Sequence, residues 1–112
     1  MIFPQFKVTP PRRKALDYAL ERLEMLSSEE CFELFEETKP NFPRPIIRGR
    51  HSSQYQFEGV KPSVLRFIVK LMKDKFDHYS VSAQGSKSIF EFADILELYA
   101  DDLELFLASN NT

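Results

Sequence analysis

One stretch, residues 62–77, limits the possible folds more than any other part of the chain. At 100° per residue, its apolar side chains would cover an arc of about 200° around a helix. A helix this apolar must be surrounded by other elements, so the stretch predicts the central helix of a core, with Pro62 at its start. Only Arg66, Lys70 and Lys73 remain for a narrow outer ridge. The apolar set is Val64, Leu65, Phe67, Ile68, Val69, Leu71, Met72 and Phe76.

Two further helices are predicted before this one. Thr9 followed by Pro10 and Pro11 is typical of a helix start, because proline at the first helical position loses no hydrogen bond. Residues 27–30, Ser-Ser-Glu-Glu, match a capping box that opens a second helix over about residues 28–38. We expect the second helix to expose glutamates that repeat every four residues and to bury an apolar face. The exposed set is Glu29, Glu33 and Glu37, and the buried set is Cys31, Phe32, Leu34 and Phe35.

Extended segments are predicted on both sides of the central helix. The prolines and the glycine of residues 39–50 exclude a helix there, which leaves an ordered connector. Tyr55 and Phe57 alternate with polar residues, as in a short strand. Residues 78–92 combine alternation with a Gln-Gly-Ser turn, and this combination predicts a β-hairpin.

A last helix is predicted over about residues 92–108. Its apolar side chains recur at steps of four and three, and we expect them to face the core. The predicted fold class is therefore α+β, with about four helices in the order α-α-β-α-β-β-α packed on a small, mostly antiparallel sheet or hairpin. At 112 residues the chain is expected to form a single domain, residues 1–112, with flexible ends at 1–8 and 109–112. The core-facing series of the last helix is Phe92, Leu96, Tyr99, Leu103 and Phe106.

Charge is segregated along the chain, although the formal net charge is only −2. Residues 1–15 carry +4, residues 16–38 carry −7, residues 39–75 carry +7 and residues 76–112 carry −6. Blocks of opposite sign can neutralise each other within the fold. Alternatively, at least one block faces a charged partner, because surface potential steers association over about one Debye length. The sequence leaves both interpretations open.

The sequence predicts no catalytic residue, no metal site and no cofactor. Cys31 belongs to an apolar helix face, where a free thiol is ordinarily small hydrophobic packing. The chain has no G-x-S-x-G elbow and, with three glycines, no glycine-rich phosphate loop. The soft metal ligands Cys31, His51 and His78 stand far apart in the sequence. We therefore expect a protein that is not an enzyme, and a metal-free ribonuclease using His51 and His78 as acid and base is the remote alternative.

The basic segment, residues 39–57, gives a nucleic-acid-binding alternative. Arginines bracketed by prolines and aromatic residues can hold phosphates while a ring stacks on a base. A solvated basic loop that neutralises the glutamates of the second helix explains the same pattern. The candidate nucleic-acid-binding residues are Arg44, Arg48, Arg50, His51 and Tyr55.

Two apolar pairs on the charged sides of helices favour a protein-binding module instead. Tyr18 and Met25 are seven residues apart, as are Leu98 and Leu105, and both pairs lie outside the core-facing arcs. Apolar anchors inside a charged rim are typical of an interface. In a competing arrangement, the two pairs pack against each other inside the chain. The predicted partner-binding residues are Tyr18, Met25, Glu29, Glu33, Glu37, Asp94, Leu98, Asp101 and Leu105.

The expected function is therefore binding of another macromolecule without catalysis. A protein of this kind suits the role of an inhibitor, an immunity- or antitoxin-like protein, a phage-type regulator or a small complex subunit. Its expected partner is another protein or a second copy of the chain. A single cysteine, an N-terminus without a signal-peptide layout and the absence of an apolar run near the ~20 residues of a membrane span favour a cytoplasmic location without a membrane partner.

Overall fold

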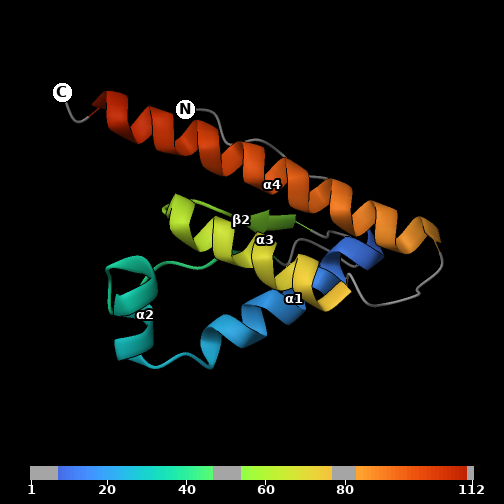
Figure 1. Cartoon of the computed structure of the whole chain (residues 1–112), viewed down its shortest axis with the longest axis horizontal. Coiled ribbons are helices and arrows are strands. Elements are labelled where there is room, and N and C mark those ends of the chain that lie inside the picture. Colours follow the sequence, from blue (N-terminus) through green and yellow to red (C-terminus); the bar gives the residue numbers. More distant parts are fainter. Residues whose placement is uncertain (1–7, 47–53, 77–82, 111–112) are drawn as a thin grey trace.

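The helix predicted over residues 62–77 is α3, Pro62–Phe76, in a computed structural model that describes residues 8–46, 54–76 and 83–110. Helices α1, α2 and α4 all pack against α3 (Figure 1). The apolar arc of α3 is buried except for Phe67 and Leu71, which are half-buried, so its prediction as the central helix is confirmed. The other elements are α1 (Pro10–Glu24), α2 (Ser28–Phe35), β1 (Arg44–Ile46), β2 (Gln54–Gln56) and α4 (Ala83–Asn110).

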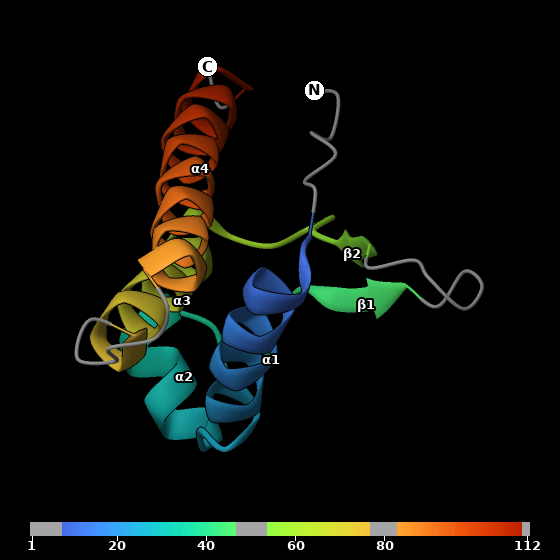
Figure 2. The same cartoon turned by 90° about the vertical axis from the view of Figure 1, so that its right-hand side faces the viewer.

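Helix α4 runs along α3 in the opposite chain direction, and α1 meets the N-terminal half of α4 (Figure 1). Figure 2 shows the strand pair set to one side of the helices. The core is one cluster built mainly from α1, α3 and α4, with Phe57 entering it just after β2. Val8 is also buried, although the sequence assigns it to a flexible end. The side chains that are completely enclosed include Leu16, Leu23, Phe57, Leu65, Ile68, Phe92 and Leu96.

The predicted capping box of α2 is present. The Glu30 backbone N–H donates to Ser27 Oγ at 3.1 Å, and the Ser27 N–H donates to Glu30 Oε1 at 3.2 Å. The helix ends at Phe35, three residues before its predicted end, because Glu36 adopts the left-handed conformation with φ of 61°. A left-handed residue after the last helical turn is a common way for a helix to stop.

The predicted buried face of α2 is too wide. Cys31 and Phe35 are buried, but Phe32 is 57% exposed and Leu34 is 43% exposed. The reason is that α2 packs against only one of the other helices, α3, so a narrow arc suffices to cover that contact. Phe32 and Leu34 flank this arc on opposite sides.

The predicted β-hairpin over residues 78–92 is wrong for residues 83–92, which form the first turns of α4. Ile89, Phe92 and Ala93 are buried together, at the spacing of a helix rather than at the alternation of a strand. Two residues of the alternating pattern, Tyr79 and Val81, lie outside the described residues. The described part of the chain is thus mostly helical, and the predicted α+β sheet is reduced to one strand pair.

The core-facing series of α4 is confirmed only in its first part. Phe92, Leu96 and Tyr99 are buried, Leu103 is half-buried and Phe106 is 38% exposed. Arg66, four residues after the start of α3, contacts Glu104 of the antiparallel helix α4. The turns of α4 that follow Glu104 lie beside the start of α3, which offers them little cover. The core therefore ends near Leu103.

The strand pair is antiparallel, with Arg44 opposite Gln56 and Ile46 opposite Gln54. It includes the short strand predicted around Tyr55. After β2 the chain turns at Gly59, which has φ of +76° and accepts a hydrogen bond from Asn41 Nδ2 at 3.4 Å. A Cβ at position 59 would lie 2.9 Å from that nitrogen, so glycine suits both the backbone and the space.

Candidate functional site

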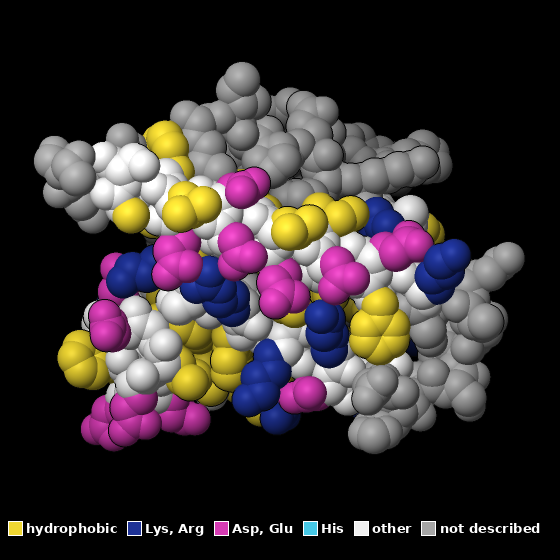
Figure 3. Space-filling model, turned by 45° about the horizontal axis from the view of Figure 1, so that its top comes forward, with side chains coloured by type: hydrophobic (Ala, Val, Ile, Leu, Met, Phe, Trp, Pro, Cys, Tyr) yellow, Lys and Arg dark blue, Asp and Glu magenta, His cyan; other side chains and the backbone are white. Residues whose placement is uncertain are grey.

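The acidic side chains of α4 that face α3 are held by the basic ridge of α3. Arg66 Nη2 lies 2.9 Å from Asp101 Oδ1 and also contacts Glu104. Lys73 Nζ lies 3.2 Å from Asp94 Oδ1 and 3.5 Å from a Glu97 carboxylate oxygen. Figure 3 shows the result as a row of acids along α4 opposite a row of Lys and Arg.

These contacts shift the ionisation of both partners. Hydrogen bonds to Glu104 and Asp101 raise the pKa of the Arg66 guanidinium, and the hydrogen bond to Asp94 raises the pKa of the Lys73 ammonium. The hydrogen bond from Arg66 lowers the pKa of Glu104. The charged form of each group is therefore favoured in the folded chain.

Ion pairs outside the contact between α3 and α4 also join a basic block of the sequence to an acidic one. Lys61 Nζ lies 3.0 Å from Glu37 Oε1, and Arg12 Nη2 lies 3.7 Å from Glu91 Oε2. Each ion pair among residues 8–46, 54–76 and 83–110 joins two sequence blocks of opposite charge. Mutual neutralisation thus accounts for much of the charge segregation. Three acids assigned to partner binding, Glu37, Asp94 and Asp101, have cationic partners within the chain.

The two predicted apolar pairs do not pack against each other. Leu98 is 65% exposed and Leu105 is 69% exposed, while Met25 is 72% exposed at the end of α1. Tyr18 instead packs edge-on against the Phe76 ring, with centroids 6.3 Å apart, and has the Lys75 ammonium over its face. The competing arrangement, in which these pairs form a small internal cluster, is therefore wrong.

The exposed leucines belong to a larger surface on α4, which we call the Asp102 face. Four apolar residues surround Asp102 on this helix. Ile95 and Leu98 lie seven and four residues before it, and Leu105 and Phe106 lie three and four residues after it. These offsets place all five on one side of a helix. Asp102 and the two leucines are exposed, and Ile95 and Phe106 are 40% and 38% exposed, so each member of the face reaches solvent. Hydrophobic side chains are visible along α4 beyond the acidic row in Figure 3.

Asp102 differs from the acids that face α3. Within the part of the chain that the structure describes, its carboxylate forms no ion pair. Ile95 and Asp102 were not predicted as site residues, and Phe106 was assigned to the core-facing series, although the steps of three and four that connect 95, 98, 102 and 105 are visible in the sequence. The signal was hidden because the buried series of the same helix follows the same spacing.

A second exposed apolar site lies on α2. Phe32 helps to line a shallow hollow of about 330 Å³ together with Ser28, Glu29, Glu33 and Thr38. Glu29 and Glu33 are exposed, as the sequence predicts. They lie beside a single exposed ring, a smaller apolar surface than the Asp102 face.

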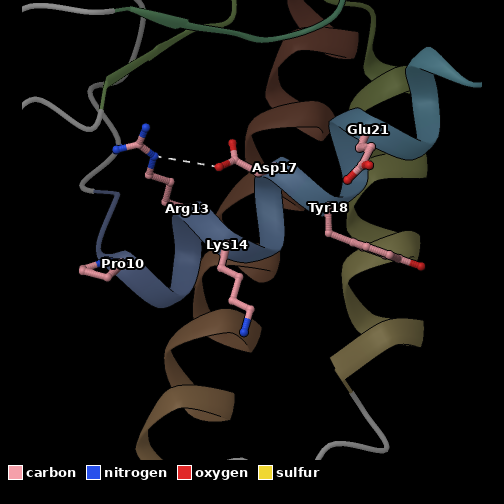
Figure 4. Close-up of a pocket in the computed structure, with 6 residues that line it drawn as sticks. All are labelled: Pro10, Arg13, Lys14, Asp17, Tyr18 and Glu21. Carbon is pink, nitrogen blue, oxygen red and sulfur yellow. Dashed lines mark ion pairs between the residues drawn. The ribbon is translucent and has the colours of Figure 1, made fainter.

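An open hollow of about 510 Å³ on α1 does not converge on a reactive group (Figure 4). Arg13 and Asp17 face each other across 3.8 Å, whereas Lys14 and Tyr18 point in different directions. Pro10 and Glu21 complete the lining. Charges that neutralise each other and side chains that diverge give this hollow no evident chemistry.

The nucleic-acid-binding candidates are only partly placed. Arg44 is exposed on β1, but the Tyr55 hydroxyl donates to the Asp17 carboxylate and its ring packs against the core. Partial burial and the bond to Asp17 raise the pKa of Tyr55. Tyr55 is thus committed to contacts within the chain. Arg48, Arg50, His51 and, for the ribonuclease alternative, His78 lie outside the described residues.

The described residues carry neither a metal-binding cluster nor a membrane-spanning helix. Across the described ranges, no group of three His, Cys, Asp or Glu residues is arranged to hold a metal ion. In the same ranges, no helix has the length and apolar character needed to cross a membrane. Comparison of the chain with protein-family models, with curated proteins and with solved structures finds no match.

Proposed function

We propose that this chain is a non-enzymatic protein-binding module and that the Asp102 face of α4 is its contact surface. The observation that carries the proposal is the exposure of Leu98 and Leu105, at 65% and 69%, on the outer side of the longest helix. An exposed leucine adds little to the stability of the free chain, but its apolar surface stabilises a complex that covers it.

The shape of the surface supports this role. A helix of 28 residues is about 42 Å long, so α4 presents a straight edge along which several apolar side chains can act together. Asp94 and Asp101 border the face, and each forms an ion pair with a cation of α3. Apolar anchors beside a rim of held charges give a preorganised contact surface.

The proposal changes the roles of the acids predicted from the sequence. The row that faces α3 stabilises the fold and borders the surface, while the leucines supply the contact. The roles that this proposal includes are those of a small regulator, an inhibitor, an antitoxin-like protein or a complex subunit. The specific role within that group depends on the partner.

Affinity capture from the native host tests the proposal. The wild-type chain and the double variant Leu98→Ser, Leu105→Ser are used as bait, each with and without nuclease. The double variant should lose at least about 90% of a nuclease-resistant protein partner, because both anchors are removed. Leu107→Ser is the matched control: Leu107 is 43% exposed on the same helix but points away from the Asp102 face.

Three outcomes are informative. Retention of the partner by the double variant would contradict the proposal. Equal loss with Leu107→Ser would show that disturbing α4 in general, rather than this face, is responsible. Loss of all captured material on nuclease treatment would favour the nucleic-acid alternative of residues 39–57.

A further inference from the structure

We infer that the Asp102 face binds a basic amphipathic helix of another protein, with a lysine or arginine of that helix on the Asp102 carboxylate. This inference rests on the proposed function and specifies the chemistry of the partner. It starts from the position of Asp102, whose four apolar neighbours on the helix surface are Ile95, Leu98, Leu105 and Phe106.

A partner that covers these apolar side chains must also cover Asp102. Removing a carboxylate from water without a compensating charge or hydrogen bond is strongly unfavourable. Arg66 and Lys73 are already engaged with other acids on the α3 side of the helix. No cation of the described residues forms an ion pair with Asp102, so we assign the missing cation to the partner.

The spacing of the face indicates that the partner is helical. Ile95, Leu98, Asp102 and Leu105 follow one another at steps of three, four and three, which is the spacing of a seam between two helices packed side by side. Such a seam accepts one polar residue among apolar ones, and the polar residue selects the partner. Asp102 occupies that position here.

Charge argues against a second copy of the chain as the occupant. A symmetric contact centred on this face would bring one Asp102 against the other. Asp94 and Asp101 on the border would add further like charge, and like charges across an interface are strongly unfavourable. A helix with Lys or Arg opposite these acids removes the conflict. We therefore assign the face to a heterologous partner.

Three synthetic peptides test the inference. Each has three heptads, is held helical by a side-chain lactam and carries leucine at alternating steps of three and four. The position opposite Asp102 and its flanks carry lysine in the first peptide, glutamine in the second and glutamate in the third. Fluorescence anisotropy gives the affinity of each labelled peptide for the full chain, and amide chemical shifts locate the contact.

We expect the lysine peptide to bind at least about tenfold more tightly than the glutamine peptide, and the glutamate peptide to bind least. Amide shifts should follow residues 91–106. Asp102→Asn should weaken the lysine peptide by at least about fivefold and leave the glutamine peptide unchanged. Asp74→Asn, which removes the same charge from an exposed site on α3, should alter neither peptide.

Equal binding of the lysine and glutamine peptides, or an Asp102→Asn variant with unchanged affinities, would overturn the inference. So would a light-scattering result that shows a dimer which Leu98→Ser dissociates, because the occupant would then be a second copy. In each case the capture experiment with Leu98→Ser and Leu105→Ser still decides separately whether the α4 face binds a protein at all.

Discussion

The two long sides of α4 use the same residue types in different ways. On the side that faces α3, Asp94, Glu97, Asp101 and Glu104 are all engaged by Arg66 or Lys73. On the outer side, Asp102 has apolar neighbours and no cation among the described residues. Acidic composition alone therefore does not mark a binding surface. The informative feature is an acid that has no ion pair among the described residues and lies next to apolar side chains that reach solvent.

The largest expected difference between the sides of α4 concerns two leucines that are two residues apart. Leu96 is completely buried, so Leu96→Ala should lower the free energy of unfolding by about 3 kcal/mol, through lost apolar burial and a remaining cavity. Leu98→Ala should change it by less than about 0.5 kcal/mol. Urea unfolding curves of both variants give the comparison. Similar losses for the two would mean that Leu98 is covered in solution.

The ion pairs between α3 and α4 are expected to contribute less. Arg66→Gln removes contacts to Asp101 and Glu104, but the pairs are partly exposed and water screens them, so a loss of about 1 kcal/mol or less is expected. The loss should shrink in 1 M salt, where the Debye length falls to about 3 Å. A loss that is independent of salt would assign the role of Arg66 to packing of its aliphatic part.

The pH dependence of stability should report the same contact. Because Arg66 lowers the pKa of Glu104 below its ordinary value of 4.5, the contribution of this carboxylate is fully present above pH 4.5. It is lost as the pH falls through the lowered pKa. Urea midpoints measured downward from pH 5.5 should therefore fall less steeply for Glu104→Gln than for the wild type. Parallel profiles would show that the Glu104 contact is weak in solution.

A smaller effect is expected where the backbone ends α2. Glu36 holds φ of 61°, which glycine adopts without the steric cost of a Cβ. Glu36→Gly should raise the free energy of unfolding by up to about 0.5 kcal/mol, since the gain is offset by greater freedom of the unfolded chain. A decrease would indicate that the Glu36 side chain itself stabilises this turn.

The sequence allows the prediction of elements whose signals are local. The capping box at Ser27 and Glu30 and the apolar arc of α3 both depend on residues within one or two turns, and both are confirmed. The start of α4 could not be predicted in this way. Gln84-Gly85-Ser86 resembles a turn, but burial of Ile89 and Phe92 against other helices extends α4 through this tripeptide.

The candidate site was predicted in part for the same reason. The exposure of Leu98 and Leu105 follows from their place outside the main apolar arc, and the structure agrees. Which acids have internal partners depends on where Arg66 and Lys73 lie, and this is set by the packing of α3 on α4 rather than by local sequence. Asp102 therefore stood out only once those pairs were known.

The central claim is that Leu98 and Leu105 on the Asp102 face of α4 contact a partner and add little to the stability of the free chain. The most direct measurement combines the thermal melt of the double variant Leu98→Ser, Leu105→Ser with its retention of the captured protein. We predict a free energy of unfolding within about 0.5 kcal/mol of the wild type together with loss of the partner. A melting temperature lowered by many degrees with the partner retained would contradict the claim and place both leucines in the core.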